Sequence, residues 1–306
     1  MRINRRVVGD NIWLSRVDHY DDVSKYGRMA VYSMRPEVLE SEEAVGRAMV
    51  EELERAGREK TGDIAIALLG GRGAQAMHRI LGELSRGNKL DWLLQRLHVF
   101  TQDALAPMRM NNSFSFVRDF ERLLGLEFFR KVKSFTPMCT DVTDFEAELA
   151  SYTQKLDAAG GLDIFFLGHG PEPEGASHLA YIRPGSGATA ADVAGVIPVS
   201  PSILEHHISK FRAGGIAARS EEEIECRQVT HIFTLGPAAI LGSKRIVQSI
   251  VDAATAPAKR ASYRRVMETL PAADGPARAK QLDENPGLWI RLHPSVRSLV
   301  LPDVLG

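Results

Sequence analysis

Cysteine is nearly absent from this chain, which has only Cys139 and Cys226 in 306 residues. Two thiols so far apart form neither a disulfide framework nor a close pair of metal ligands, so the reducing cytoplasm is the expected compartment. Long apolar runs are missing as well, and none approaches the roughly 18 residues that a membrane helix needs. The N-terminus has no continuous apolar core and no small-residue cleavage site, so we expect no signal peptide and no membrane partner.

The chain also has little excess charge, with a formal net charge of −1 at pH 7. This balance argues against general binding of nucleic acid, although it leaves room for a local basic patch that binds a small anion. Apolar residues make up 44% and charged residues 25% of the chain, which is typical of a globular protein.

Short, continuous apolar runs alternate with helix-like stretches along the chain. Such runs are typical of strands covered on both faces, so the alternation predicts a doubly wound α/β fold with a mainly parallel sheet and helices on both faces. The predicted strands are residues 63–70, 97–102, 162–168, 231–236 and 288–292, with a weaker candidate at 194–200. The predicted helices are residues 41–57, 74–86, 115–125, 144–161 and 243–255, with Ser41 and Asp144 at two of their starts.

No long linker, repeat or low-complexity block divides the chain. We therefore expect an N-terminal arm over residues 1–27 and one α/β domain over residues 28–306.

Ligands of open α/β sheets bind beyond the carboxyl ends of the strands, so the residues that follow each predicted strand are candidates for the site. Gly70, Gly71, Arg72 and Gly73 follow the first of these strands and precede a helix. Glycine lets the backbone approach a ligand, the helix start offers free N–H groups to a phosphate, and Arg72 adds charge. The alternative is a tight turn between strand and helix.

Two further strand ends carry acid–base groups. Asp103 follows the second strand, where its carboxylate could act as a base. The alternative is a structural role, as a helix cap or a hydrated loop carboxylate. His169, Glu172, Glu174 and His178 follow the third strand. Their spacing matches no specific metal-ligand pattern, so we expect neither a metal nor another cofactor.

A late basic segment contains the pairs Lys244-Arg245 and Lys259-Arg260. These cations are either phosphate ligands or solvated surface groups, and the pairs alone do not decide between the two.

Taken in order, these segments resemble the superfamily of glucosamine-6-phosphate deaminase/isomerase and 6-phosphogluconolactonase. "LLGGRGAQAM" resembles its Gly-Gly-Ser-Thr-Pro phosphate loop, and "FTQDALAP" resembles its Phe-x-x-Asp-Glu-Tyr segment. "DIFFLGHG…SHLAYIRPGS" resembles Asp-Leu-x-x-x-Gly-x-Gly-x-Asp-Gly-His-Ile-Ala-Phe-Asn-Glu-Pro. The segments "NNSF", "TLGPAAILGSKRIVQSIV" and "NPGLWIRLHPSVRSLVL" resemble later family segments, and the resemblance spans about residues 28 to 302.

The resemblance implies a modified Rossmann-like fold and a small phosphorylated sugar as the ligand. It implies that Asp103 is the carboxylate that shuttles a proton and that His178 assists ring opening. It places Lys259 and Lys210 at the phosphate, together with the glycine loop. Family members range from monomers to hexamers, so a homo-oligomer stays open.

The chain departs from the family motifs at several positions. The acid after the shuttle carboxylate is Ala104, the Asp-Gly before the histidine becomes Ala176-Ser177, and the acid before Pro184 is Arg183. A second alignment pairs Glu174-Gly175 with the Asp-Gly but leaves His178 two residues too late, so the first alignment is preferred. Within it we expect Glu174 to fold back and replace the missing carboxylate. We expect Arg183 to contact a carboxylate or a second phosphate of the substrate.

Three functions are compatible with these motifs and departures. The leading one is a sugar-phosphate isomerase or amino-sugar-phosphate deaminase. The second is a lactone hydrolase, in which His178 activates water. The third is a phosphosugar sensor without catalysis, and the absence of a helix-turn-helix segment argues against a DNA-binding form of it.

Overall fold

A sheet of seven parallel strands forms the centre of the computed structural model, which describes residues 3–17, 23–254 and 256–306. The strand order is β3-β14-β13-β8-β4-β5-β7, and every neighbouring pair in it is parallel. The strands are β3 (Pro36–Val38), β4 (Ile64–Leu68), β5 (Leu97–Thr101), β7 (Ser134–Thr136), β8 (Ile164–Leu167), β13 (Arg245–Ile250) and β14 (Val296–Val300). The predicted fold class is thus confirmed.

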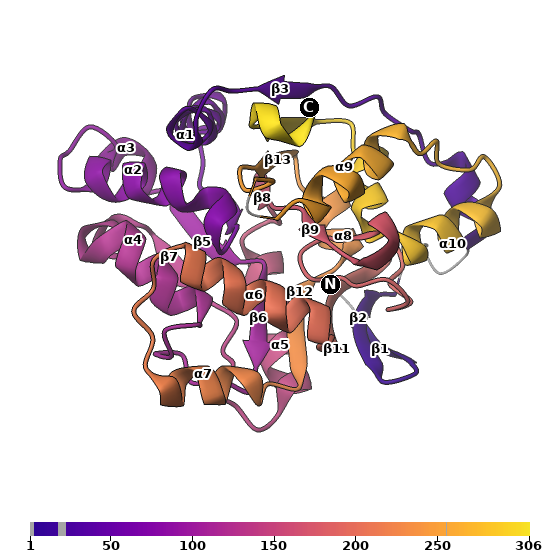
Figure 1. The fold of residues 1–306 in the computed structure, drawn as a ribbon. Coiled ribbons are helices and arrows are strands. Elements are labelled where there is room, and N and C mark those ends of the chain that lie inside the picture. Colours follow the sequence, from indigo (N-terminus) through magenta and orange to yellow (C-terminus); the bar gives the residue numbers. More distant parts are fainter. Residues whose placement is uncertain (1–2, 18–22, 255) are drawn as a thin grey trace.

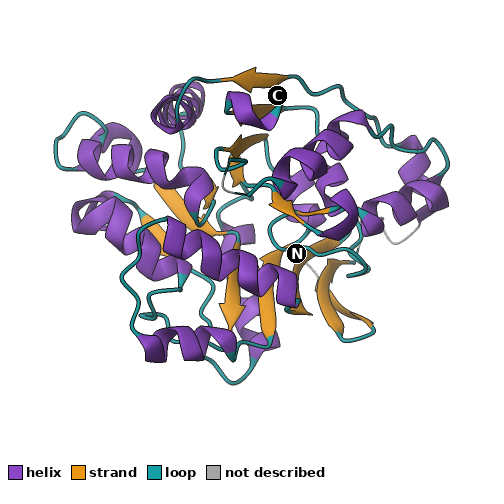
Figure 2. Cartoon of the chain, in the orientation of Figure 1, coloured by secondary structure: helices purple, strands orange, loops and turns teal. Residues whose placement is uncertain are grey.

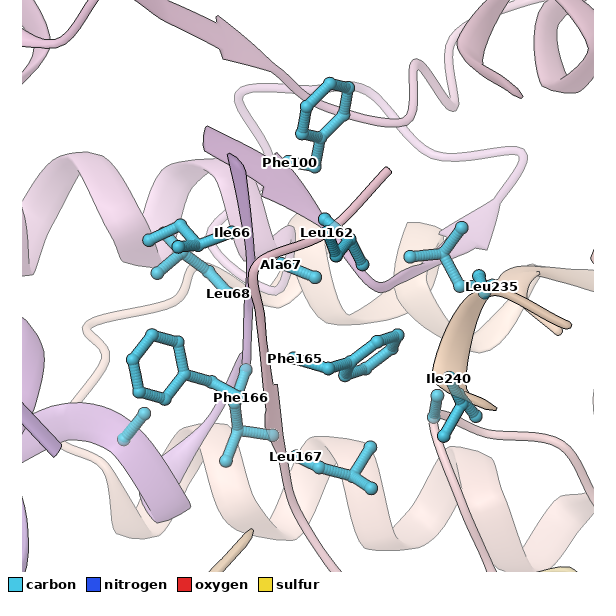
Figure 3. Close-up of a cluster of buried hydrophobic side chains, with 14 of the residues drawn as sticks. Ile66, Ala67, Leu68, Phe100, Leu162, Phe165, Phe166, Leu167, Leu235 and Ile240 are labelled. Atoms are coloured by element: carbon cyan, nitrogen blue, oxygen red, sulfur yellow. The ribbon is translucent and has the colours of Figure 1, made fainter. Parts of the chain in front are cut away.

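The central strands of this sheet are buried on both faces. Phe166 of β8 points to the same side as Ile66 and Leu68 of β4, whereas Phe165 points to the opposite side, towards Leu235 and Ile240 (Figure 3). All residues of β4 and β8 are buried. Burial on both faces explains why these strands are continuous apolar runs in the sequence.

Helices surround the sheet and connect its strands (Figures 1 and 2). They are α1 (Glu42–Glu59), α2 (Gln75–Ser85), α3 (Asp91–Leu94), α4 (Phe116–Lys131), α5 (Phe145–Ala158), α6 (Pro201–Ala213), α7 (Ser220–Arg227), α8 (Pro237–Leu241), α9 (Ala258–Glu268) and α10 (Gly275–Glu284). The predicted caps are confirmed, because Ser41 Oγ accepts from the Ala44 N–H at 3.1 Å and Asp144 Oδ1 accepts from the Ala147 N–H at 2.9 Å. Among the described residues, no helix is both long and apolar enough to cross a membrane.

A second, antiparallel sheet has the order β1-β2-β11-β12-β6. Its strands are β1 (Ile3–Val8), β2 (Asn11–Arg16), β6 (Asp103–Ala106), β11 (Asp192–Pro198) and β12 (His231–Leu235). The weaker strand candidate at 194–200 is therefore confirmed as β11. The strand predicted at 231–236 is confirmed as β12, although it lies in this second sheet.

The segment predicted as an N-terminal arm supplies the hairpin of β1 and β2, while its residues 1–2 and 18–22 lie outside the described part of the chain. Strand β2 pairs with β11, and the fully buried Trp13 packs against Gly195 of that strand. Trp13 Nε1 donates to the Ser186 carbonyl at 3.0 Å, which ties the hairpin to the segment 167–186. The boundary at residue 28 stays a prediction.

Two predicted elements are wrong. The helix predicted over residues 243–255 is strand β13, and the strand predicted over residues 288–292 is a 3-10 helix, Pro286–Leu292. Residues 246–253 and 286–292 of these segments are all buried, so their apolar residues show neither the helical nor the strand period, and residue 255 lies outside the described part of the chain. In the first, β-branched residues favour a strand, and in the second, Pro286 at the first position favours a helical turn.

Candidate active site

The carboxyl ends of four neighbouring parallel strands, β13, β8, β4 and β5, border one pocket. Because parallel strands end at the same edge of a sheet, residues far apart in the sequence meet there. The pocket is lined by Leu69, Gly70, Arg72, Gly73, Gln102, Asp103, Phe116, Gly168, His169, Gly170, His178, Ala180, Tyr181, His206, Lys210, Ser249 and Lys259.

The predicted glycine loop lies at this pocket, between β4 and α2. Gly70, Arg72 and Gly73 line the pocket, whereas Gly71 does not and has a φ of 71°, which favours glycine. The Arg72 guanidinium donates to Glu42 Oε1 at 2.7 Å, so its charge is partly neutralised within the protein. The loop thus presents to a ligand its backbone groups and the Arg72 guanidinium, which is already paired with Glu42.

Asp103 lies where the chain leaves the parallel sheet and enters the antiparallel one, at the first position of β6. It is 5% exposed and lines the pocket. Burial raises the pKa of its carboxyl group from 3.8 to about 8. A carboxyl group with a pKa near neutrality can both accept and return a proton.

His178 forms a buried pair with Glu172, a residue that the sequence analysis did not single out for this role. His178 Nδ1 lies 2.7 Å from Glu172 Oε1, and Ser202 Oγ of α6 donates to Glu172 Oε2 at 2.9 Å. Burial lowers the pKa of His178, and Glu172 opposes that effect. Burial therefore favours a neutral imidazole, while the contact with Glu172 fixes its proton on Nδ1 and leaves Nε2 as the basic atom.

The local backbone fixes the position of this imidazole. Strand β9 (Gly170–Pro171) pairs antiparallel with β10 (Ser177–His178), so His178 lies opposite Gly170. A Cβ atom at Gly170 would lie 1.7 Å from His178 Nε2, so only glycine accommodates the ring there.

The segment after His178 has an uncommon conformation. Ala180 and Tyr181 have φ angles of 48° and 59°, in the left-handed region that non-glycine residues rarely adopt. The Tyr181 hydroxyl lies 2.9 Å from His207 Nδ1, and the opposite ring nitrogen of His207 lies 2.8 Å from the Phe114 carbonyl oxygen. These contacts hold Tyr181 against the pocket, and its ring lies 5.1 Å from the ring of His178.

Two predicted site residues lie elsewhere. Glu174 is exposed and is not among the residues that line the pocket, so it does not fold back beside His178. Arg183 does not line the pocket either, and its guanidinium donates to the Pro198 carbonyl at 3.2 Å. The motif Gly-x-Gly-x-Asp, aligned on Gly168 and Gly170, places Glu172 at the Asp position and the extra residues after it. That alignment is the signal that could have identified Glu172.

Lys210 and Lys259 are brought together by Asp252, which the sequence analysis missed. Lys259 Nζ donates to Asp252 Oδ1 at 2.7 Å, and Lys210 Nζ donates to Oδ2. Burial would raise the pKa of Asp252, but the two lysines outweigh it and hold that pKa below its usual range. Burial and the charge of Lys259 hold the pKa of Lys210 well below its usual range.

This lysine pair can bind an anion at one end of the pocket, because two ammonium groups share one carboxylate. The other cations of the late basic segment pair outside the pocket, as Lys244 contacts Asp163 and Arg245 contacts Glu59. No cluster of metal-ligating side chains occurs in the described ranges.

We expect replacement of Glu172 by glutamine to lower the pKa of His178 further, because the carboxylate that stabilises the imidazolium is removed. NMR titration of His178 measures this shift. Glu174→Gln is the matched control and should leave the titration unchanged. An equal effect of both variants would contradict the pairing.

The model of the family "Glucosamine-6-phosphate isomerases/6-phosphogluconolactonase" matches residues 38–209, more than half of the chain. The chain belongs to this family. The matched range contains the glycine loop, Asp103 and the His178–Glu172 pair, while Asp252 and Lys259 lie beyond it.

Solved structures show the same fold. A monomeric glucosamine-6-phosphate deaminase is 20% identical with a TM-score of 0.64, over 89% of this chain and 98% of that chain. The 6-phosphogluconolactonase from Trypanosoma cruzi is 13% identical with a TM-score of 0.61, over 90% and 97%. The 6-phosphogluconolactonase from Trypanosoma brucei is 16% identical with a TM-score of 0.58, over 89% and 98%. Deaminase and lactonase structures are thus both similar to this chain.

Proposed function

We propose that this protein is a sugar-phosphate isomerase or amino-sugar-phosphate deaminase that moves a proton between C1 and C2 of its substrate. The observation that carries the proposal is that two acid–base groups line one pocket, Asp103 with a pKa raised to about 8 and His178, which is paired with Glu172. A proton shuttle between two carbons needs one group for ring opening and a second for the carbon-bound proton.

The steps follow from the placement of these groups. The neutral His178, with Nε2 as its basic atom, takes the proton of the C1 hydroxyl and passes it to the ring oxygen as the C1–O5 bond breaks, which leaves an aldehyde at C1. The ionised form of Asp103 then takes the C2 proton while the C1 oxygen gains a proton from solvent, which gives an enediol, or an enolamine for an amino sugar. Asp103 returns its proton to C1 as the C2 hydroxyl or amino group loses one to solvent, which gives the ketose, or an imine that water hydrolyses to the ketose and ammonia. Lys210 and Lys259 bind the phosphate and thereby position C1 and C2 of the substrate beside His178 and Asp103.

The proposal implies a small phosphorylated sugar as the partner of the pocket. It also implies a cytoplasmic location, because charged sugar phosphates do not cross a membrane unaided. The Asp-Ala sequence at Asp103-Ala104 places no second carboxylate next to the shuttle group, so the proposal assigns the C1–C2 transfer to Asp103 alone.

A second candidate is hydrolysis of a sugar-phosphate lactone. It is favoured by Arg183, because this residue replaces the family acid before Pro184 and does not line the pocket, so the pocket lacks the deaminase carboxylate of that position. In this reaction the His178–Glu172 pair would activate a water molecule, and no carbon-bound proton would move.

Incubation in deuterated water with a panel of hexose, amino-sugar and sugar-acid phosphates separates the two reactions. We expect deuterium at C1 or C2 of one sugar phosphate and a new ketose signal in the NMR spectrum. Lactone opening without deuterium incorporation would replace the proposal by the hydrolase. Saturable binding without any change over hours would indicate a sensor.

A further inference from the structure

One face of helix α6 contributes three polar side chains to the pocket region at intervals of four residues. These are Ser202, His206 and Lys210. Residues four apart lie on the same face of a helix and are separated by about 6 Å along its axis. The stripe therefore runs from the acid–base pair to the anion-binding end of the pocket, and Figure 1 shows α6 crossing the middle of the molecule.

The two ends of this stripe have partners that define their roles. Ser202 donates to Glu172, which in turn contacts His178. Lys210 contacts Asp252, which also binds Lys259. One helix face thus touches both the reacting end and the phosphate end of the pocket.

His206 lies between these two ends and has no assigned role. It lines the pocket, is partly exposed, and its ring centroid lies 5.7 Å from that of His178 at an interplanar angle of 75°. In the described part of the chain, its ring nitrogens make no hydrogen bond, whereas those of the neighbouring His207 are both occupied. A pocket-lining imidazole with free nitrogens has hydrogen bonds to offer a ligand.

Burial and the charges of Lys210 and Lys259 lower the pKa of His206. The imidazole is therefore uncharged at neutral pH, with one N–H donor and one acceptor nitrogen. Such a ring suits hydroxyl groups, which both donate and accept, better than it suits a phosphate, which only accepts.

We propose that His206 determines which sugar the pocket accepts, by binding the hydroxyl groups between the reacting carbons at His178 and the phosphate at Lys210 and Lys259. This inference rests on the proposed function and adds its specificity-determining residue. The hydroxyls concerned are those at C3 and C4 of a hexose 6-phosphate in its ring form, since C1 and C2 react, the C5 oxygen closes the ring and C6 carries the phosphate. A side chain that binds a hydroxyl rejects the epimer in which that group points away.

The test compares the dissociation constants of glucose 6-phosphate, its C3 epimer allose 6-phosphate, its C4 epimer galactose 6-phosphate, and inorganic phosphate. For the wild-type protein, we expect the dissociation constants of at least two of the sugars to differ by about 10- to 100-fold. In His206→Leu, which keeps side-chain volume but removes the hydrogen bonds, this ratio of dissociation constants should fall to less than about threefold. The affinity for inorganic phosphate should stay unchanged, because the two lysines remain.

Glu205→Gln is the matched control on the same helix, since Glu205 is exposed and contacts Arg227. It should retain wild-type discrimination. Equal affinities of the wild type for all three sugars, or unchanged discrimination in His206→Leu, would overturn the inference. A parallel loss of affinity for inorganic phosphate would also overturn it, since His206 would then be an anion ligand.

Binding and turnover separate this inference from the function on which it rests. If His206→Leu loses discrimination in binding while the wild type incorporates no deuterium, the proton shuttle fails and the role of His206 in sugar recognition stands. If deuterium is incorporated and discrimination is unchanged, the shuttle stands and the role of His206 fails.

Discussion

Replacing Asp103 by asparagine should lower kcat on the true substrate by about 10³- to 10⁴-fold, because the amide cannot take the C2 proton. Deuterium exchange into the sugar should disappear together with turnover, while binding of the phosphosugar persists through Lys210 and Lys259. Steady-state kinetics and NMR exchange measure the two effects. Unchanged turnover by Asp103→Asn would exclude the proposed shuttle.

The same substitution should stabilise the fold in a pH-dependent manner. Folding raises the pKa of Asp103 from 3.8 to about 8, so ionisation of this group increasingly destabilises the folded wild type as pH rises through that window. Asparagine does not ionise, so the excess stability of Asp103→Asn over the wild type should grow by about 3–4 kcal/mol between pH 5 and pH 8.

Chemical denaturation at several pH values measures this difference. It should level off above about pH 8, where the wild-type carboxyl group is already ionised. A difference that stays constant from pH 5 to pH 8 would show that the pKa of Asp103 is not raised. The stability measurement is independent of the substrate, so it tests the carboxyl group even before the substrate is identified.

Replacing Asp252 by asparagine should destabilise the protein by about 3–5 kcal/mol, because it removes the counter-charge between a buried and a partly buried ammonium group. Lys259 is 3% exposed, and both lysines contact the Asp252 carboxylate. Thermal or chemical unfolding measures the loss. Added inorganic phosphate should restore more stability to this variant than to the wild type, since an anion can take the place of the carboxylate.

Glu127→Ala provides the control for this prediction. Its ion pair with Arg130 lies on the surface, where both side chains are largely exposed, so its loss should cost less than about 1 kcal/mol. An equal effect of the two substitutions would show that the Asp252 carboxylate does not stabilise the fold as the counter-charge of the two lysines. The absence of any rescue by phosphate would argue against an anion site there.

The central part of the sheet is predictable from sequence because burial on both faces leaves a local signal. The runs containing Ile66 and Phe166 are continuous and apolar, and the glycines and acid–base groups that follow them mark strand ends. The wrong element types at residues 243–255 and 288–292 have the same origin. Full burial removes the polar face that would show the period of the element.

The partners of the site residues cannot be predicted from the sequence in this way, because they depend on distances in space. Glu174 is nearer to His178 in the sequence than Glu172 is, but only Glu172 is brought to its ring by the pairing of β9 with β10 and by Ser202 of α6. Asp252 carries no motif of its own, and its role arises because α6 and α9 each direct one lysine to it.

The sequence by itself determined the family, the α/β class and the positions of Asp103, His178, Lys210 and Lys259 along the chain, because these follow from local patterns and motif order. Only the tertiary structure decided which carboxylates accompany them and that Arg183 does not line the pocket. It also placed His206 between the two ends of the pocket. The physical reason is that hydrogen bonds and ion pairs depend on distances of a few ångströms, which the fold sets between residues that lie far apart in the chain.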